Sequence, residues 1–357
     1  MSDYQSVGVV GAGAWGTALA IAAHRAGRDV TLWAYERETV EEINHEHSNH
    51  IYLPNVTLDR KIRATAKVSE VGAADMILMV VPSQFFRGVA AEFTTHVSGK
   101  PVIICTKGFE EDTGKTMADI VAEALPDALP GVLAGPSFAS EIARGLPAAL
   151  TLAAPEEVVG LRVANALGSR SLRLYWSDDV MGAQIGGAVK NVLAIAAGIV
   201  AGRQLGDNAR AGIMTRGFAE LMRFGVAMGA KPETLMGLSG LGDLILTCSS
   251  EQSRNMSLGK ALGEGKTLAE ILGSRRSVSE GAHSAAAAVA RAGELGIELP
   301  ICNAVRAILA DEMGVDDAIE AVLSRPFKSE AEPFTARMVS AAAEAAAPNR
   351  KQPRKSA

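Results

Sequence analysis

The chain has 357 residues, of which 48% are hydrophobic and 21% are charged, and its formal net charge is −5. This composition is globular, leaves room for two domains, and provides no positive field that would gather nucleic acid. The cysteines Cys105, Cys248 and Cys302 are widely spaced and form no CxxC pair, so they predict neither a disulfide framework nor a thiolate zinc site. They favour a reducing cytoplasm, and MSDYQSVGVV lacks the features of a secretion signal.

A glycine-rich turn near the N-terminus predicts a dinucleotide site. The valine-rich run Ser6 to Val10 is typical of a strand and leads into Gly11, Gly13 and Gly16, after which Thr17 to Arg25 has a helical apolar pattern. The first glycine permits a tight turn, the second lets backbone approach a pyrophosphate, and the third permits close helix packing. Alone, GxGxxG indicates only a glycine turn. Placed between a strand and a helix, it predicts a Rossmann-type fold.

The second strand carries the residues that would contact the adenosine ribose. Val30 to Tyr35 is apolar and of strand length, and Glu36 stands 20 residues after Gly16, where an acid can hold ribose hydroxyls. The next residue, Arg37, can instead attract a 2′-phosphate. The choice between NAD and NADP therefore stays open.

Further strands follow, and polar residues stand just after them. Met76 to Val81 and Val102 to Thr106 are nearly continuous apolar runs, as expected for parallel strands covered on both faces. Doubly wound sheets bind ligands beyond the carboxyl ends of their strands, which is where Lys107 stands. The alternative is a solvated loop lysine. Between these strands and the glycine turn, INHEHSNHIYLP holds three histidines without the HExxH pattern, and we predict no metal site.

The sheet ends in a sharp turn and two more strands. Val132 to Ala134 enters GPSFASE, in which Gly135 and the proline permit a turn and Ser137 either caps the next helix or contacts a ligand. Leu150 to Ala153 and Leu172 to Trp176 complete the predicted sheet.

The stretch Val180 to Ala201 is an apolar helix with a charge at its centre. Only Gln184, Lys190 and Asn191 carry polar side chains, so a transmembrane helix is disfavoured. Small residues share the face of Lys190 and would leave room for a ligand against it. These residues are Ala183, Gly187, Ala194 and Ala197. The alternative is a lysine that extends to the surface from a packed helix.

From Val180 to about Leu323 the pattern predicts helices only. Three glycines precede Asp243, which begins an apolar helix. It lies four residues before Thr247, so the two side chains share a helix face. The alternative is that Asp243 only caps this helix. Arg254 and Asn255 offer a phosphate a forked donor and an amide. The sequence thus predicts a Rossmann-type domain at 1–178, an all-α domain at 179–335, and a basic, partly disordered extension at 336–357.

Six motifs in order resemble one family. They are GAGAWGTALA, TKGFE, GPSFASE, GAVKNVLAIAAG, GLGDLILTC and SRN. Together, over Val7 to about Glu280, they resemble the bacterial-type NAD(P)-dependent glycerol-3-phosphate dehydrogenases. The resemblance implies interconversion of sn-glycerol 3-phosphate and dihydroxyacetone phosphate for phospholipid synthesis, by a Rossmann domain followed by an all-helical domain, usually in a homodimer. From the residues themselves we expect a cytoplasmic protein with no integral membrane segment.

The resemblance also implies roles for individual residues. Lys190 would be the proton acceptor, with Asp243 orienting it or a substrate hydroxyl. The substrate would contact Lys107, Gly135, Ser137, Lys190, Asp243, Ser253, Arg254 and Asn255. The NAD or NADP would contact Gly11, Gly13, Ala14, Trp15, Gly16, Tyr35, Lys107, Ala139, Arg254, Val278 and Glu280. Family members often carry a basic residue or histidine where Tyr35 stands, which leaves the cofactor preference open.

The chemistry expected of Lys190 follows from its protonation. Burial would lower its pKa, so that neutral lysine accepts the hydroxyl proton during oxidation and the ammonium donates it during ketone reduction. The rival functions are a related two-domain dehydrogenase for a β-hydroxy acid or a 6-phosphogluconate-like sugar acid, and a silent nucleotide-binding sensor.

Overall fold

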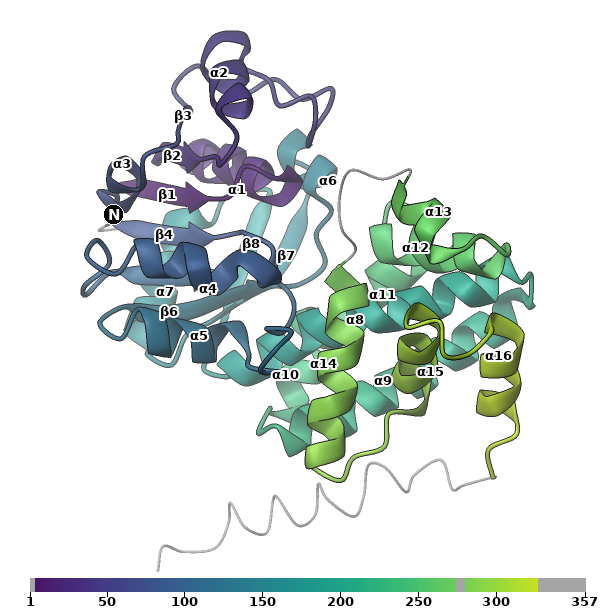
Figure 1. Cartoon of the computed structure of the whole chain (residues 1–357). Helices are drawn as coiled ribbons and strands as arrows, with labels where there is room; N and C mark the ends of the chain where they lie inside the picture. The colour runs from purple at the N-terminus through teal and green to yellow at the C-terminus, as the bar shows by residue number, and fades with distance from the viewer. Residues whose placement is uncertain (1–3, 274–279, 327–357) are drawn as a thin grey trace, which may run out of the picture.

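The computed structural model describes residues 4–273 and 280–326. They form a sheet domain followed by a helical domain (Figure 1). Val278 and the predicted extension 336–357 lie outside the described residues, and the limits 1–178 and 179–335 stay predictions.

An eight-stranded sheet organises the first domain. Its strand order is β3-β2-β1-β4-β5-β6-β7-β8. The chain extends the sheet in one direction from β1 to β3 and in the other from β4 to β8, so the direction switches between β1 and β4. The strands are β1 (Ser6–Val10), β2 (Asp29–Trp33), β3 (Arg63–Thr65), β4 (Met76–Met79), β5 (Pro101–Ile104), β6 (Leu129–Ala134), β7 (Ala148–Ala153) and β8 (Leu172–Ser177). The predicted Rossmann-type doubly wound architecture is confirmed. Two details were not predicted: the short edge strand β3, and the antiparallel pairing of β7 with β6.

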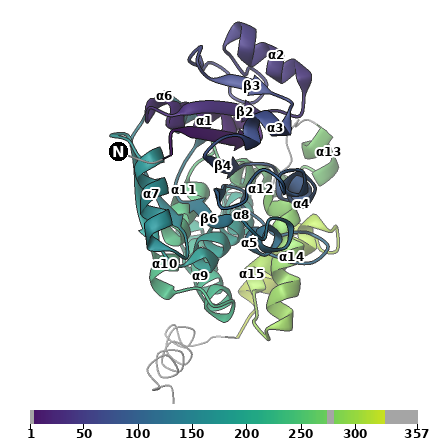
Figure 2. The same cartoon turned by 90° about the vertical axis from the view of Figure 1, so that its left-hand side faces the viewer.

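Helices cover both faces of the sheet, which explains the continuous apolar strands. Along β4, Met76 and Leu78 pack in one core, and Ile77 and Met79 pack in the other, as the alternation of side chains along a strand requires. Figure 2 shows α1, α6 and α7 on one side of the strands and α4 and α5 on the other. The helices of this domain are α1 (Ala14–Arg25), α2 (Arg37–Glu46), α3 (Val68–Gly72), α4 (Ser83–Glu92), α5 (Met117–Ala124), α6 (Ala139–Arg144) and α7 (Glu157–Leu167).

The second domain is built around α8 (Val180–Gly202). The helices that follow are α9 (Gly206–Ala227), α10 (Pro232–Met236), α11 (Asp243–Ser249), α12 (Arg254–Gly263), α13 (Leu268–Gly273), α14 (Glu280–Glu294), α15 (Pro300–Leu309) and α16 (Val315–Leu323). By length and composition α8 is apolar enough to cross a membrane, but 89% of its most apolar window is buried inside the protein. It is therefore the core helix of this domain.

The small residues of α8 serve helix packing more than a pocket. A Cβ on Gly198 would overlap the Met256 carbonyl oxygen of α12, so the two backbones are in contact. Ala194 and Ala197 lie in the core of the helical domain, and Ala183 lies in a core of the sheet domain. The prediction that this face is open to a ligand is therefore wrong for the three alanines.

Candidate active site

Lys190 is buried in the middle of α8 and points at the start of α11. Its Nζ donates hydrogen bonds to Asp243 Oδ1 at 2.8 Å and to Thr247 Oγ1 at 2.7 Å. The residue is only 6% exposed, so a lysine that extends to the surface is excluded. Thr247 was predicted to share a face with Asp243, but its direct contact with Lys190 was not predicted.

Asp243 lies between two lysines from different domains. Its Oδ2 accepts a hydrogen bond at 2.8 Å from Nζ of Lys107, which follows β5, while Oδ1 accepts from Lys190. The Lys107 Nζ also lies 3.4 Å from the carbonyl oxygen of Gly135, which follows β6. Lys107 is therefore not a solvated loop lysine. Asp243 thus links a residue beyond the carboxyl edge of the sheet to a residue of α8.

A π-helical turn, Leu238–Gly242, delivers Asp243 to this position. A Cβ at Gly240 would overlap the Leu235 carbonyl oxygen, so the turn requires glycine there. The N-cap of α11 is Gly242, whereas the Asp243 side chain is bonded to the two lysines. The alternative that Asp243 is a simple cap is therefore wrong.

Burial changes the acid–base properties of this centre. The pKa of Lys190 is lowered to about 8, because burial disfavours its ammonium; Asp243 opposes this effect and the Lys107 charge adds to it. Burial also raises the pKa of the nearby Cys248 thiol to about 12, so the thiol stays neutral. Near neutral pH, Lys190 can therefore exist in both protonation states.

The other residues predicted to contact the substrate lie on neighbouring elements. The Ser137 hydroxyl donates to the Gly135 carbonyl at 3.0 Å, and the N-cap of α6 is Phe138, so the capping alternative for Ser137 is wrong. Ser253 caps α12, accepting from Met256 N at 3.2 Å. The two residues after Ser253 differ in exposure. Arg254 is exposed at the start of α12, whereas Asn255 is buried and accepts a hydrogen bond from a backbone N–H of α14.

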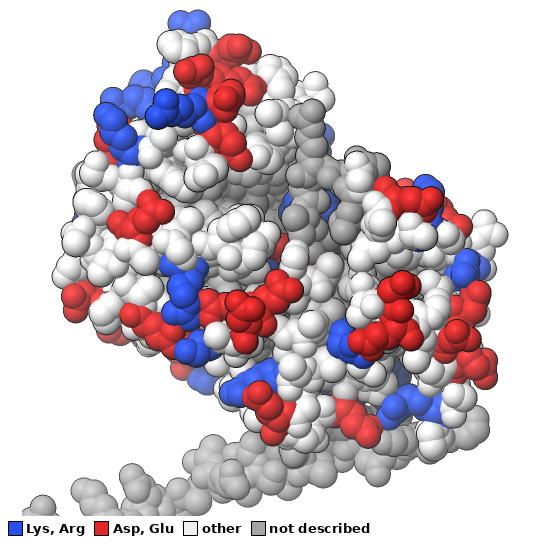
Figure 3. All heavy atoms as spheres, in the orientation of Figure 1, with Lys and Arg blue, Asp and Glu red and all other residues white. Residues whose placement is uncertain are grey.

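Glu280 begins α14 close to these cations. Burial raises its pKa, while the charges of Arg254, Lys107 and Lys190 oppose that effect. Figure 3 shows that this face of the molecule is hollowed between the two domains, with Lys or Arg side chains visible inside the hollow. Positive charge at the domain junction suits an anionic ligand.

The glycine turn has the geometry that a dinucleotide needs. Gly11 has φ +116°, and its Cβ would lie 3.0 Å from the backbone after β4; a Cβ on Gly16 would overlap the Gly11 carbonyl oxygen. In contrast, a Cβ at Gly13 would meet nothing within 4 Å, which leaves space above the start of α1, and no side chain caps that end. The buried Trp15 Nε1 has no hydrogen-bond partner among the described residues. These features fit a bound pyrophosphate, with Ala14 as the first residue of the helix.

The remaining residues predicted to contact the cofactor differ in exposure. Tyr35 follows β2 and is 82% exposed, with its ring centroid 6.5 Å from that of Trp33. Glu36 accepts a hydrogen bond from the Tyr52 hydroxyl at 3.1 Å, and Ala139 begins α6, which packs on α1. Within the described residues, no group of three His, Cys, Asp or Glu side chains is placed to hold a metal ion.

Comparison with known proteins gives consistent matches over the chain. Models for the N-terminal and C-terminal parts of the NAD-dependent glycerol-3-phosphate dehydrogenases match residues 6–159 and 179–320. The glycerol-3-phosphate dehydrogenase (NAD(P)+) of Parvibaculum lavamentivorans is 57% identical over 328 residues, covering 92% of this chain and 98% of that protein. The enzyme of the same name from Caulobacter vibrioides is 54% identical, covering 92% and 99%. The crystal structure of glycerol-3-phosphate dehydrogenase from Coxiella burnetii aligns with a TM-score of 0.86 at 37% identity, covering 90% of this chain and 99% of that one.

Proposed function

Because the chain belongs to the family of NAD-dependent glycerol-3-phosphate dehydrogenases, we propose that it interconverts sn-glycerol 3-phosphate and dihydroxyacetone phosphate with NAD(P), with Lys190 as the proton-transfer group. The resemblance stated from the motifs is confirmed. The observation that supports the role of Lys190 is its buried ammonium, bonded to Asp243 at the junction of the two domains. The reaction is an oxidoreduction at a CH–OH group, and its phosphorylated three-carbon product supplies glycerophospholipid synthesis.

The residues of this site manage one proton. When bound, the nicotinamide supplies or accepts the hydride. Neutral Lys190 would take the hydroxyl proton during oxidation, and its ammonium would return a proton to the oxygen during reduction. Asp243 holds the Lys190 Nζ in place and keeps its pKa from falling further. Thr247 fixes the same Nζ from a second direction, so the proton is held at a defined point.

We assign substrate and cofactor contacts as part of the same proposal. Lys107, Arg254 and Asn255 would hold the phosphate, with Gly135, Ser137 and Ser253 around the three-carbon chain. The glycine turn and Trp15 would hold the pyrophosphate, and Tyr35 would contact the adenosine end. Arg254, Ala139 and Glu280 would reach the dinucleotide from the other elements; Val278, assigned the same role, lies outside the described residues.

A homodimer in the cytoplasm is the expected working form of this enzyme. The described cysteines are free and buried, which suits a reducing compartment. Light scattering at micromolar concentration tests the dimer, since a monomer mass would exclude it.

One assay tests the proposed function directly. Absorbance of NADH and of NADPH is followed separately with dihydroxyacetone phosphate, and with a β-keto acid and a keto sugar acid as control substrates. We expect oxidation with dihydroxyacetone phosphate and little with the controls. Turnover of a control substrate alone would identify a different dehydrogenase, while nucleotide binding without any turnover would identify a sensor. The ratio of the NADH and NADPH rates gives the cofactor preference.

A further inference from the structure

The segment that carries Lys107 is a hairpin, residues 105–116, between β5 and α5. Phe109 and Thr116 form an antiparallel bridge, and Glu110 N donates to the Lys115 carbonyl at 2.9 Å. At its base, Gly108 has φ +156°, and a Cβ there would lie 3.1 Å from Ser83 Oγ. The same Cβ would lie 3.2 Å from Ser284 Oγ of α14, so the base of the hairpin is packed tightly between the two domains.

Side chains of this hairpin extend into the helical domain. Lys107 reaches Asp243, and two residues later the buried Phe109 ring lies in the helical core, 6.3 Å from the ring of Phe224. The hairpin thus connects the two halves of the active site, although its chain belongs to the sheet domain.

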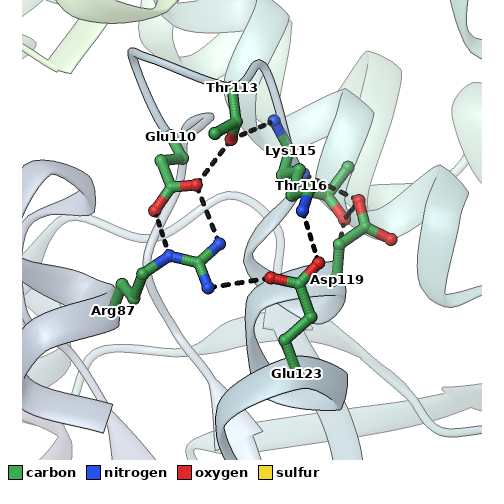
Figure 4. A network of polar contacts seen from close by, with 7 residues as sticks. All are labelled: Arg87, Glu110, Thr113, Lys115, Thr116, Asp119 and Glu123. Atoms are coloured by element: carbon green, nitrogen blue, oxygen red, sulfur yellow. Dashed lines mark hydrogen bonds and ion pairs between the residues drawn. The ribbon is translucent and has the colours of Figure 1, made fainter. Parts of the chain in front are cut away.

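One arginine on α4 anchors the hairpin to the sheet domain. Arg87 donates from Nε and Nη2 to the two carboxylate oxygens of Glu110, at 2.6 and 2.9 Å, and from Nη1 to Glu123 of α5 at 2.8 Å (Figure 4). Thr113 Oγ1 also donates to Glu110. These hydrogen bonds, led by those of Arg87, lower the pKa of Glu110 to about 2, so the pair stays charged at any working pH.

This pair differs from an ordinary surface ion pair chiefly in its geometry. The Arg87 side chain is 40% exposed, but the Glu110 side chain is 15% exposed and receives two guanidinium donors in parallel, which fixes its direction as well as its charge. Glu110 is three residues from Lys107, and the intervening Gly108 and Phe109 are both buried.

We propose that Arg87 is a positioning residue for the active site: by holding Glu110, it sets the hairpin so that Lys107 meets Asp243. The inference rests on the proposed function for its kinetic readout. Without the anchor, Lys107 spends less time beside Asp243, so substrate is bound less tightly. Lys190 then also experiences less of the Lys107 charge that lowers its pKa.

The test compares Arg87→Met with a matched control, Arg306→Met. Arg306 also makes a bidentate pair with a glutamate, Glu312, but it lies on α15 and does not contact the hairpin's Glu110. We expect Arg87→Met to raise the KM for dihydroxyacetone phosphate about 5- to 10-fold with a smaller change in kcat, since a partly exposed pair contributes about 1 kcal/mol. In glycerol 3-phosphate oxidation, its pH profile should bend at a higher pH than that of the wild type. Arg87→Lys, which keeps the charge, should recover part of the loss.

A second measurement does not depend on activity. Amide hydrogen exchange of residues 105–116 should be faster in Arg87→Met than in the wild type or in Arg306→Met. Equal KM, equal pH profile and equal exchange in the two methionine variants would overturn the inference. If the wild type does not reduce dihydroxyacetone phosphate at all, the proposed function fails, whereas the exchange comparison still decides whether Arg87 holds the hairpin.

Discussion

Replacing Asp243 with Asn should change how glycerol 3-phosphate oxidation depends on pH. In the wild type the pKa of Lys190 is about 8, because burial lowers it and Asp243 raises it. Oxidation needs the neutral amine, whose fraction at that pKa rises from about 9% at pH 7 to about 91% at pH 9, so kcat/KM should rise about tenfold and then level off. A lysine with the ordinary pKa of about 10.4 would give a rise of about a hundredfold with no plateau.

Asp243→Asn removes a carboxylate that lies 2.8 Å from Lys190 Nζ. Loss of an opposite charge at this distance lowers a lysine pKa by about 1 to 3, to about 7 or below, so the profile of the variant should rise by no more than about twofold above pH 7. Thr247→Val is the control, because Thr247 contacts the same Nζ but carries no charge; its profile should still bend near pH 8. The assay is the initial rate of NADH or NADPH formation at low substrate concentration. An Asp243→Asn profile that bends near pH 8, or a wild-type profile that climbs through pH 10, would refute the reasoning.

Four other substitutions, one of them a control, test separate parts of the structure. Lys190→Met should keep NADH binding, measured by fluorescence. It should lower the rate of ketone reduction by about 100-fold or more, because general acid–base catalysis contributes about 10²- to 10⁴-fold. Near-normal rates would exclude Lys190 from proton transfer. Gly16→Ala should abolish nucleotide binding, because its Cβ would overlap the Gly11 carbonyl oxygen. Gly88→Ala is the control, because a Cβ there meets nothing within 4 Å; it should keep nucleotide binding and raise the free energy of unfolding, measured by urea titration, by about 0.5–1 kcal/mol. Equal nucleotide binding by the two alanine variants would contradict this interpretation. Glu220→Ala leaves two backbone N–H groups at the start of α15 without their acceptor. It should therefore lower the free energy of unfolding by about 2–4 kcal/mol with no change in KM. An unchanged unfolding midpoint would show that the buried carboxylate is dispensable.

The parts of the fold that could be predicted depend on local patterns. The apolar run of β4 and the glycines before α1 identify a covered parallel sheet and a phosphate-binding turn, because each requirement lies within a few residues of chain. The buried position of Lys190 was also predictable, since a charge inside an apolar helix is costly unless it has a partner. Its partner, Asp243, was suggested by the resemblance to the family, since the place of Asp243 at a helix start also suits a simple cap.

The parts that could not be predicted depend on contacts between distant segments. Lys107 and Asp243 are 136 positions apart, and no local pattern indicates that they meet. The antiparallel direction of β7 is set by how the chain returns after β6, while its apolar pattern suits either direction. Arg87 carries no sequence signal beyond a common charge on an amphipathic helix. Its function becomes visible only when Glu110 is placed opposite it.

Phe109 also bears on how the two domains fold. Its residue number places it in the sheet domain, yet its ring completes the core of the helical domain beside Phe224. A helical segment cut away near residue 178 would lack that ring, and loss of a buried Phe side chain costs about 3–5 kcal/mol, a large share of the roughly 5–15 kcal/mol that stabilises a domain. The stability of the helical domain therefore depends on a side chain carried by residues 105–116, and an exchange of helical domains between relatives should include that segment.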